Sequence, residues 1–193
     1  MSNTTGESWQ ERSFAATEPA TQVGVRQLAL LLGLGAGIIL LEMAFRLPLK
    51  LPGHHGLEAM ALMMFGRLSS RYAWAATVVG AGAATTGLIL GVGHGALMPV
   101  FYLLPGVCLD LVFRFRPIWR NNSLLLVPLI GGLAWTCRPL VRWLATQGLD
   151  LQFGSLVNGL AWPVVTHVIF GTAGALAATL AWRHLGEKKE GAS

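Results

Sequence analysis

The residues best suited to chemistry gather in segment 51–64, Leu-Pro-Gly-His-His-Gly-Leu-Glu-Ala-Met-Ala-Leu-Met-Met. His54 and His55 lie at the expected start of a helix, and Glu58 follows within one turn. Imidazole beside a carboxylate at a helix start can bind a metal ion or an anionic ligand. The three methionines that follow extend the candidate metals to copper. Alternatively, the histidines lie at a membrane interface and the methionines face lipid.

A second candidate is Arg138, which lies between Trp135-Thr-Cys and Pro139 in an apolar segment. A charge inside a membrane is costly, so this guanidinium should face a polar cavity and meet an anion or carbonyl groups. Two explanations remain open. Arg138 either neutralises an anionic group of a ligand or pairs with an internal carboxylate such as Glu42 or Glu58.

A third group lies around Pro163 in the last apolar segment. Proline frees a backbone carbonyl about one turn earlier, near Gly159 and beside Asn158. We therefore expect a kinked, polar region that includes Trp162 and His167. The alternative for His167 is a hydrogen-bonded packing residue.

His94 is expected in a loop on the same membrane face as His54 and His55. The predicted ligand-binding set therefore lines one outward cavity and comprises His54, His55, Glu58, His94, Trp135, Arg138, Asn158, Trp162 and His167. No closely spaced metal-ligand motif and no phosphate-binding loop occurs in the sequence. Ser155 and His167 lie on one expected helix more than three turns apart, which excludes a serine–histidine catalytic contact. We therefore expect no enzymatic activity, no resident metal and no cofactor.

Other polar residues have simpler explanations. Asp110 precedes Arg114 by four residues, and an ion pair along one helix accounts for it. Cys108 and Cys137 lie in apolar segments and are interpreted as buried free thiols rather than a disulfide or a ligand pair.

The composition of the chain indicates that these residues are carried by transmembrane helices. Of the 193 residues, 53% are hydrophobic and 12% are charged, whereas a soluble domain carries about 25% charged residues. Ranges 72–109, 121–137 and 151–182 contain no Lys, Arg, Asp or Glu. Uncharged runs of this length are typical of transmembrane helices. The net charge of +5 then reflects basic residues at membrane edges rather than nucleic-acid binding.

The pattern predicts an all-α membrane protein with six transmembrane helices in a compact bundle. The expected helices are 23–45, 56–68, 72–92, 96–115, 123–146 and 155–184. We expect a disordered cytoplasmic tail over 1–22 and a short cytoplasmic tail over 185–193. This arrangement places ten of the fourteen basic residues on one side. The excess predicts that both termini are cytoplasmic.

Small residues spaced four apart mark one face of the first expected helix: Ala29, Gly33 and Gly37. Such spacing lets helix backbones approach closely in a membrane. The face serves either packing within the bundle or docking of another membrane subunit.

Six helices, about 190 residues, cytoplasmic termini, this small-residue face and the Pro-Gly turns of the outer face together resemble one family. They are similar to the substrate-binding S components of energy-coupling factor (ECF) vitamin transporters. The resemblance covers residues 23–184 and is one of architecture. It implies a multi-pass protein of the inner membrane that captures a small vitamin-like molecule at the outer face. It also implies that Ala29, Gly33 and Gly37 dock on a transmembrane coupling subunit driven by two ATPases.

The chain lacks the N-terminal Met-His hook of the nickel and cobalt members, which argues against those two substrates. Two other functions stay open. One is a structural or assembly protein of a larger membrane complex, and the other is a membrane protein that handles copper or haem through His and Met.

Overall fold

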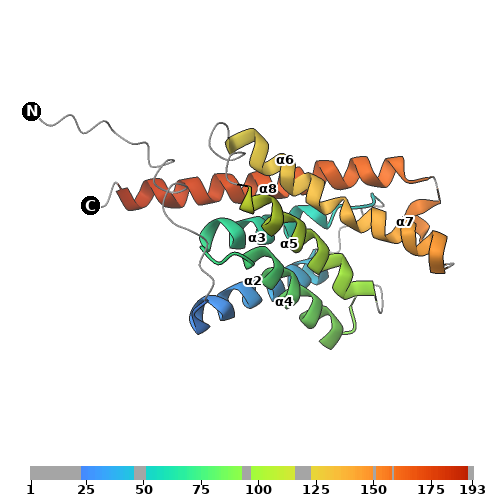
Figure 1. The fold of residues 1–193 in the computed structure, drawn as a ribbon, viewed down its shortest axis with the longest axis horizontal. Helices are drawn as coiled ribbons and strands as arrows, with labels where there is room; N and C mark the ends of the chain where they lie inside the picture. Colours follow the sequence, from blue (N-terminus) through green and yellow to red (C-terminus); the bar gives the residue numbers. More distant parts are fainter. Residues whose placement is uncertain are drawn as a thin grey trace, which may run out of the picture.

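The structure is a computed structural model that describes residues 23–45, 51–92, 97–115, 123–149, 151–157 and 159–190. The predicted all-α fold is confirmed, because regular structure in these ranges is helical (Figure 1). The elements in chain order are α2 (Val25–Ala44), α3 (Gly56–Ser69), α4 (Ala75–Ile89), α5 (Met98–Arg114), α6 (Ser123–Trp135), α7 (Cys137–Leu149), the 3-10 turn η3 (Gly154–Leu156) and α8 (Ala161–Glu190). The expected tail 1–22 lies outside the described residues.

Three helical segments are long and apolar enough to cross a membrane. They are α2, the combined α6–α7 segment Leu124–Leu149, and Ala161–Leu185 of α8. The helices α3, α4 and α5 have 14, 15 and 17 residues. At 1.5 Å per residue α3 is about 21 Å long, against about 30 Å of hydrocarbon in a bilayer. The count of six crossings and the cytoplasmic termini therefore stay predictions.

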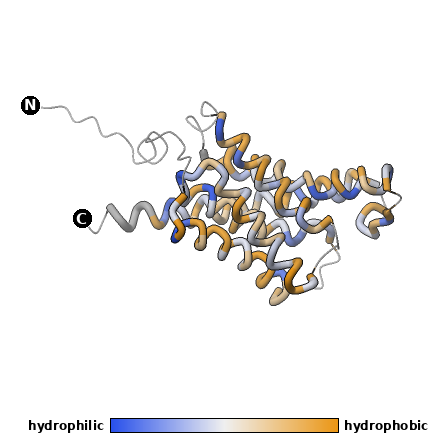
Figure 2. Tube along the Cα trace, turned by 60° about the horizontal axis from the view of Figure 1, so that its bottom comes forward, coloured by the Kyte–Doolittle hydropathy of each residue, from blue (hydrophilic) through white to orange (hydrophobic). Residues whose placement is uncertain are grey.

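The surface of the helices is apolar, as expected for contact with lipid. Val25, Ile89, Leu125 and Val157 are each more than three-quarters exposed. Figure 2 shows hydrophobic positions along most of the helices, with short hydrophilic stretches between them. A soluble protein rarely exposes so many large apolar side chains together. The composition and the surface thus agree on a membrane protein.

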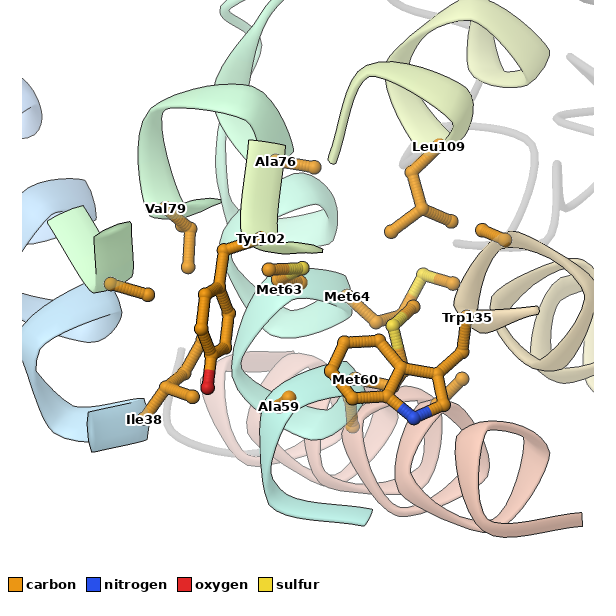
Figure 3. Packing of buried hydrophobic residues seen from close by; sticks show 14 of the residues in the cluster. Ile38, Ala59, Met60, Met63, Met64, Ala76, Val79, Tyr102, Leu109 and Trp135 are labelled. Atoms are coloured by element: carbon orange, nitrogen blue, oxygen red, sulfur yellow. The ribbon is translucent and has the colours of Figure 1, made fainter. Parts of the chain in front are cut away.

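Helix α3 lies in the middle of the bundle, where it packs on α8 and also contacts α2, α4 and α6. Its methionines, Met60, Met63 and Met64, are fully buried in the apolar core (Figure 3). The alternative of a lipid-facing methionine stripe is therefore wrong. Unbranched methionine fills the irregular space between several helices, which explains its use at this central position.

Several pairs of helices are brought close by glycine, among them α2 with α4 and α6 with α8. A Cβ at Gly35 of α2 would overlap the Val79 carbonyl oxygen of α4, and one at Gly82 would overlap the Leu32 carbonyl oxygen. Gly132 of α6 meets α8 in the same way, at Thr172. Small residues therefore serve helix contact within the bundle, as lipid supplies no hydrophobic drive for association.

The last two expected helices differ in their bounds from the structure. The fifth is interrupted at Thr136, and α7 begins at Cys137. Pro139 has no N–H to bond the Trp135 carbonyl oxygen, which accounts for the interruption. The sixth begins at Ala161 instead of Ser155 and extends to Glu190, beyond the expected end at residue 184. Pro163 consequently lies in the first turn of α8, where proline removes no intrahelical hydrogen bond. The predicted kink is therefore wrong.

The predicted Asp110–Arg114 pair is also wrong. Asp110 is fully buried, and its carboxylate accepts hydrogen bonds from the Ala76 backbone N–H (3.2 Å), the Thr77 backbone N–H (2.8 Å) and the Thr77 hydroxyl (2.7 Å). Its counterion is Arg67 of α3, with 3.5 Å between Nε and Oδ1. Arg114 instead stacks on Trp74.

Asp110 thus caps the N-terminus of α4 from the neighbouring helix α5, and a negative charge is favourable at a helix N-terminus. Arg67 also donates from Nη1 to the Ser70 and Tyr72 carbonyl oxygens, each at 3.1 Å. We call Arg67, Asp110, Thr77, Ser70 and Tyr72 the Asp110 cluster. It joins the end of α3 to α4 and α5.

Candidate ligand-binding site

The two histidines of segment 51–64 are held by a turn that two glycines shape. Gly53 has φ of +84°, a conformation that only glycine adopts easily. A Cβ at Gly53 would lie 2.5 Å from His167 Nδ1 of α8. A Cβ at Gly56 would overlap the Trp135 indole of α6. The turn therefore rests directly on Trp135 and His167, because neither glycine carries a side chain.

Beyond this turn, acidic groups converge from two helices. His55 Nδ1 lies 2.7 Å from Oε1 of Glu58, one turn along α3. Glu42, near the end of α2, brings a second carboxylate, so that one donor atom each of Glu42, His55 and Glu58 lies within 4.8 Å of the others. The Tyr102 hydroxyl of α5 lies 2.7 Å from both oxygens of Glu42 and donates its single proton to that carboxylate.

Arg138, in the first turn of α7, is enclosed by aromatic rings. Its guanidinium carbon lies 4.5 Å from the Trp135 ring centre, 4.7 Å from that of Tyr102 and 5.5 Å from that of Phe101. Arg138 is only 7% exposed, and its Nε has no hydrogen-bond partner among the described residues. Cation–π contact compensates part of the lost hydration, but it does not satisfy the N–H donors.

Trp135 is fully buried, and its indole N–H also has no hydrogen-bond partner within the described ranges. Its ring stacks on His167 at 6.3 Å between centres. His167 Nδ1 lies 2.6 Å from the Pro163 carbonyl oxygen, and since a carbonyl only accepts, Nδ1 carries the proton. Figure 3 shows the Tyr102 hydroxyl and the Trp135 nitrogen pointing toward the end of the bundle where α3 begins.

The structure thus brings together most of the predicted ligand-binding residues that it describes. We call the following set the Arg138 cluster: Glu42, His55, Glu58, Tyr102, Trp135, Arg138 and His167. His54 lies beside it, stacked on the His55 ring at 4.0 Å, with Nδ1 donating to the Leu51 carbonyl oxygen at 2.8 Å. Trp162 lies apart on the surface and is 52% exposed. His94 and Asn158 lie outside the described residues.

Three members of this environment were not predicted as ligand residues. Glu42 was considered only as a partner for Arg138. Tyr102 gave a usable signal, since it is a polar aromatic residue in the middle of an uncharged segment. Arg142 follows Arg138 by one helical turn and lies 5.2 Å from the Phe101 ring centre, so the two arginines share one face of α7. The two carboxylates offered as counterions for Arg138 have nearer partners, Tyr102 for Glu42 and His55 for Glu58.

The three residues of the predicted docking face differ in their surroundings. Ala29 and Gly33 are exposed, and within the described ranges no neighbouring atom lies within 4 Å of a Cβ placed at Gly33. Gly37 is partly buried, with the Leu62 side chain 3.5 Å from such a Cβ. Gly35, between them, is the glycine that packs on α4. The role of the exposed face in docking stays a prediction.

The Arg138 cluster is suited to binding rather than to covalent chemistry. It offers buried N–H donors, two carboxylates and flat aromatic faces, a combination typical of sites for small polar molecules with a ring. The buried methionines lie in the apolar core and not in this cluster, so the donors at hand are nitrogen and oxygen. Comparisons with protein-family models, curated proteins and solved structures gave no match to this chain.

Proposed function

We propose that the protein is a non-enzymatic substrate-binding subunit of a membrane importer, which captures a small anionic molecule with a ring. The observation that carries the proposal is the pair of adjacent buried N–H donors, Arg138 Nε and Trp135 Nε1, which have no acceptor among the described residues. An unsatisfied buried donor costs about 1–3 kcal/mol. A bound carboxylate or phosphate would supply the acceptors and neutralise Arg138, while its ring would lie against the aromatic side chains.

Binding can be tested on the purified protein in detergent or nanodiscs. Native mass spectrometry of the protein purified from its own host should reveal a bound small molecule, and calorimetry with that molecule should give its affinity. Arg138→Gln should weaken binding by about 10-fold or more, since a charge-assisted hydrogen bond contributes about 1.5–3 kcal/mol.

Tryptophan variants give a matched comparison. Trp135→Phe removes a buried N–H and should lower affinity, whereas Trp162→Phe changes an exposed residue and should leave affinity unchanged. Equal affinity in wild type and Arg138→Gln would contradict the proposed site. Purified protein without any bound molecule would instead favour a structural role in a membrane complex.

The importer part of the proposal concerns the exposed face at Ala29 and Gly33. The small side chains of this face would let α2 pack closely against a helix of an ATP-driven coupling subunit. If genes for two ATPases and a transmembrane subunit lie beside this gene, the four products should be purified together. Gly33→Leu should then disrupt that complex while leaving ligand affinity unchanged, because no atom of another described helix lies within 4 Å of a Cβ placed at Gly33.

A further inference from the structure

We propose that Glu42, His55 and Glu58 form a binding site for one divalent transition-metal cation, with Tyr102 as a positioning residue for Glu42. The three groups come from the end of α2 and the start of α3 and its preceding turn, and one donor atom of each lies within 4.8 Å of the other two. A metal ion at about 2.0–2.2 Å from each donor fits between them after small side-chain rotations.

Charge supports a cation at this position. Two carboxylates converge here, and the His55 imidazole contacts Glu58 through Nδ1 and stacks on the His54 ring. Arg138 is separated from Glu42 by Tyr102, whose ring lies against the guanidinium and whose hydroxyl binds the carboxylate. Carboxylates that converge at a partly buried place repel each other, and a divalent ion removes this repulsion.

The donors indicate the class of metal. One imidazole nitrogen with carboxylate oxygens suits Zn²⁺ or Mn²⁺, whereas Cu⁺ prefers the thiolate and thioether sulfur that this cluster lacks. The His55 and Glu58 side chains are 34% and 17% exposed, so an ion can reach them from the surface. The Tyr102 hydrogen bond holds the Glu42 carboxylate, as outer partners of metal ligands commonly do.

The test begins with full-length protein treated with a chelator and then titrated with Zn²⁺ and, separately, Mn²⁺. Elemental analysis should find one ion per chain, and bound Mn²⁺ should change its electron paramagnetic resonance spectrum. Glu42→Gln and Glu58→Gln should each weaken binding at least about 10-fold, and Tyr102→Phe by about 10-fold. The matched control is Tyr72→Phe, which removes a tyrosine hydroxyl at the other end of α3, and its affinity should equal that of wild type.

Two results would overturn the proposal: less than one ion per chain, or equal affinity in wild type, Glu42→Gln and Glu58→Gln. Each variant is first checked for an unchanged melting temperature, so that loss of the ion is not loss of the fold. The conservative Glu58→Asp variant should retain metal while Glu58→Gln does not. The metal site does not depend on the proposed importer function, because Arg138→Gln should lose the organic ligand and still bind the ion.

Discussion

The two ends of α3 carry polar clusters of opposite character. At its end, Arg67 and Asp110 contact each other, and the Asp110 oxygens accept three hydrogen bonds at the start of α4. At its beginning, Arg138 meets aromatic rings instead of a carboxylate, and buried donors lack acceptors among the described residues. The Asp110 cluster pairs its two charges within the bundle and therefore stabilises the fold, although Arg67 Nε has no hydrogen-bond partner among the described residues. In the Arg138 cluster, the N–H groups of Arg138 Nε and Trp135 Nε1 are available to a ligand that offers hydrogen-bond acceptors.

The largest expected effect is at Asp110. Asp110→Ala leaves the Arg67 charge buried without its partner and removes the cap of α4, so it should lower the free energy of unfolding by about 3–5 kcal/mol. Thermal and denaturant unfolding in detergent measures the change. In the double variant Asp110→Leu, Arg67→Met the loss should be smaller than in Asp110→Ala, because no unpaired charge remains. A loss below about 1 kcal/mol for Asp110→Ala would contradict the structural role of this cluster.

The same substitution at the two arginines tests the comparison directly. Arg67→Met breaks an ion pair and should cost about 3–5 kcal/mol. Arg138→Met places an apolar side chain of similar length among three aromatic rings, and its stability should stay within about 1 kcal/mol of wild type. Both are measured as unfolding free energies without added ligand. Equal losses of stability would mean that Arg138 contributes as much to the fold as the ion-paired Arg67.

A smaller effect is expected at the turn that carries His54 and His55. Gly56→Ala forces a methyl group into the Trp135 indole and should destabilise the protein by about 1–3 kcal/mol. Gly33→Ala is the matched control in open space and should stabilise by up to about 1 kcal/mol, since alanine favours helix. Tryptophan fluorescence should shift in the first variant only. A stable Gly56→Ala protein with unchanged fluorescence would contradict this packing.

The smallest structural change is expected from joining α5 to α7 through a disulfide. Cys108 and Cys137 are free, with sulfurs 3.4 Å apart. A disulfide needs about 2.05 Å, so a small movement suffices. Treatment with an added disulfide reagent should link the two thiols, each losing one hydrogen, while the reagent is reduced. Mass spectrometry of the peptides detects the link, and Cys137→Ser should abolish it.

Much of the helical frame could be predicted from the sequence. Apolar segments with few charges located the first four helices within three residues of their ends, and the fifth as the combined α6–α7 segment, because a lipid-facing helix carries few charges. The two ends of α8 were the least accurate boundaries, each six residues from its expected position. At its start, an apolar sequence continues through the 3-10 turn, so hydropathy does not mark where the helix begins. Asp110 was assigned to the wrong arginine because spacing along one helix says nothing about a charge that another helix supplies.

The sequence by itself indicated that the helices face lipid, and it singled out the few charged and polar residues within apolar segments. An arginine, a histidine or a glutamate in such a segment is costly wherever it lies. Only the tertiary structure decided which of them meet. Tyr102 joins Glu42 to the Arg138 environment from a different helix, and Trp162 lies outside it although it is only five residues from His167. Contacts between helices depend on rotation and crossing, which composition does not encode.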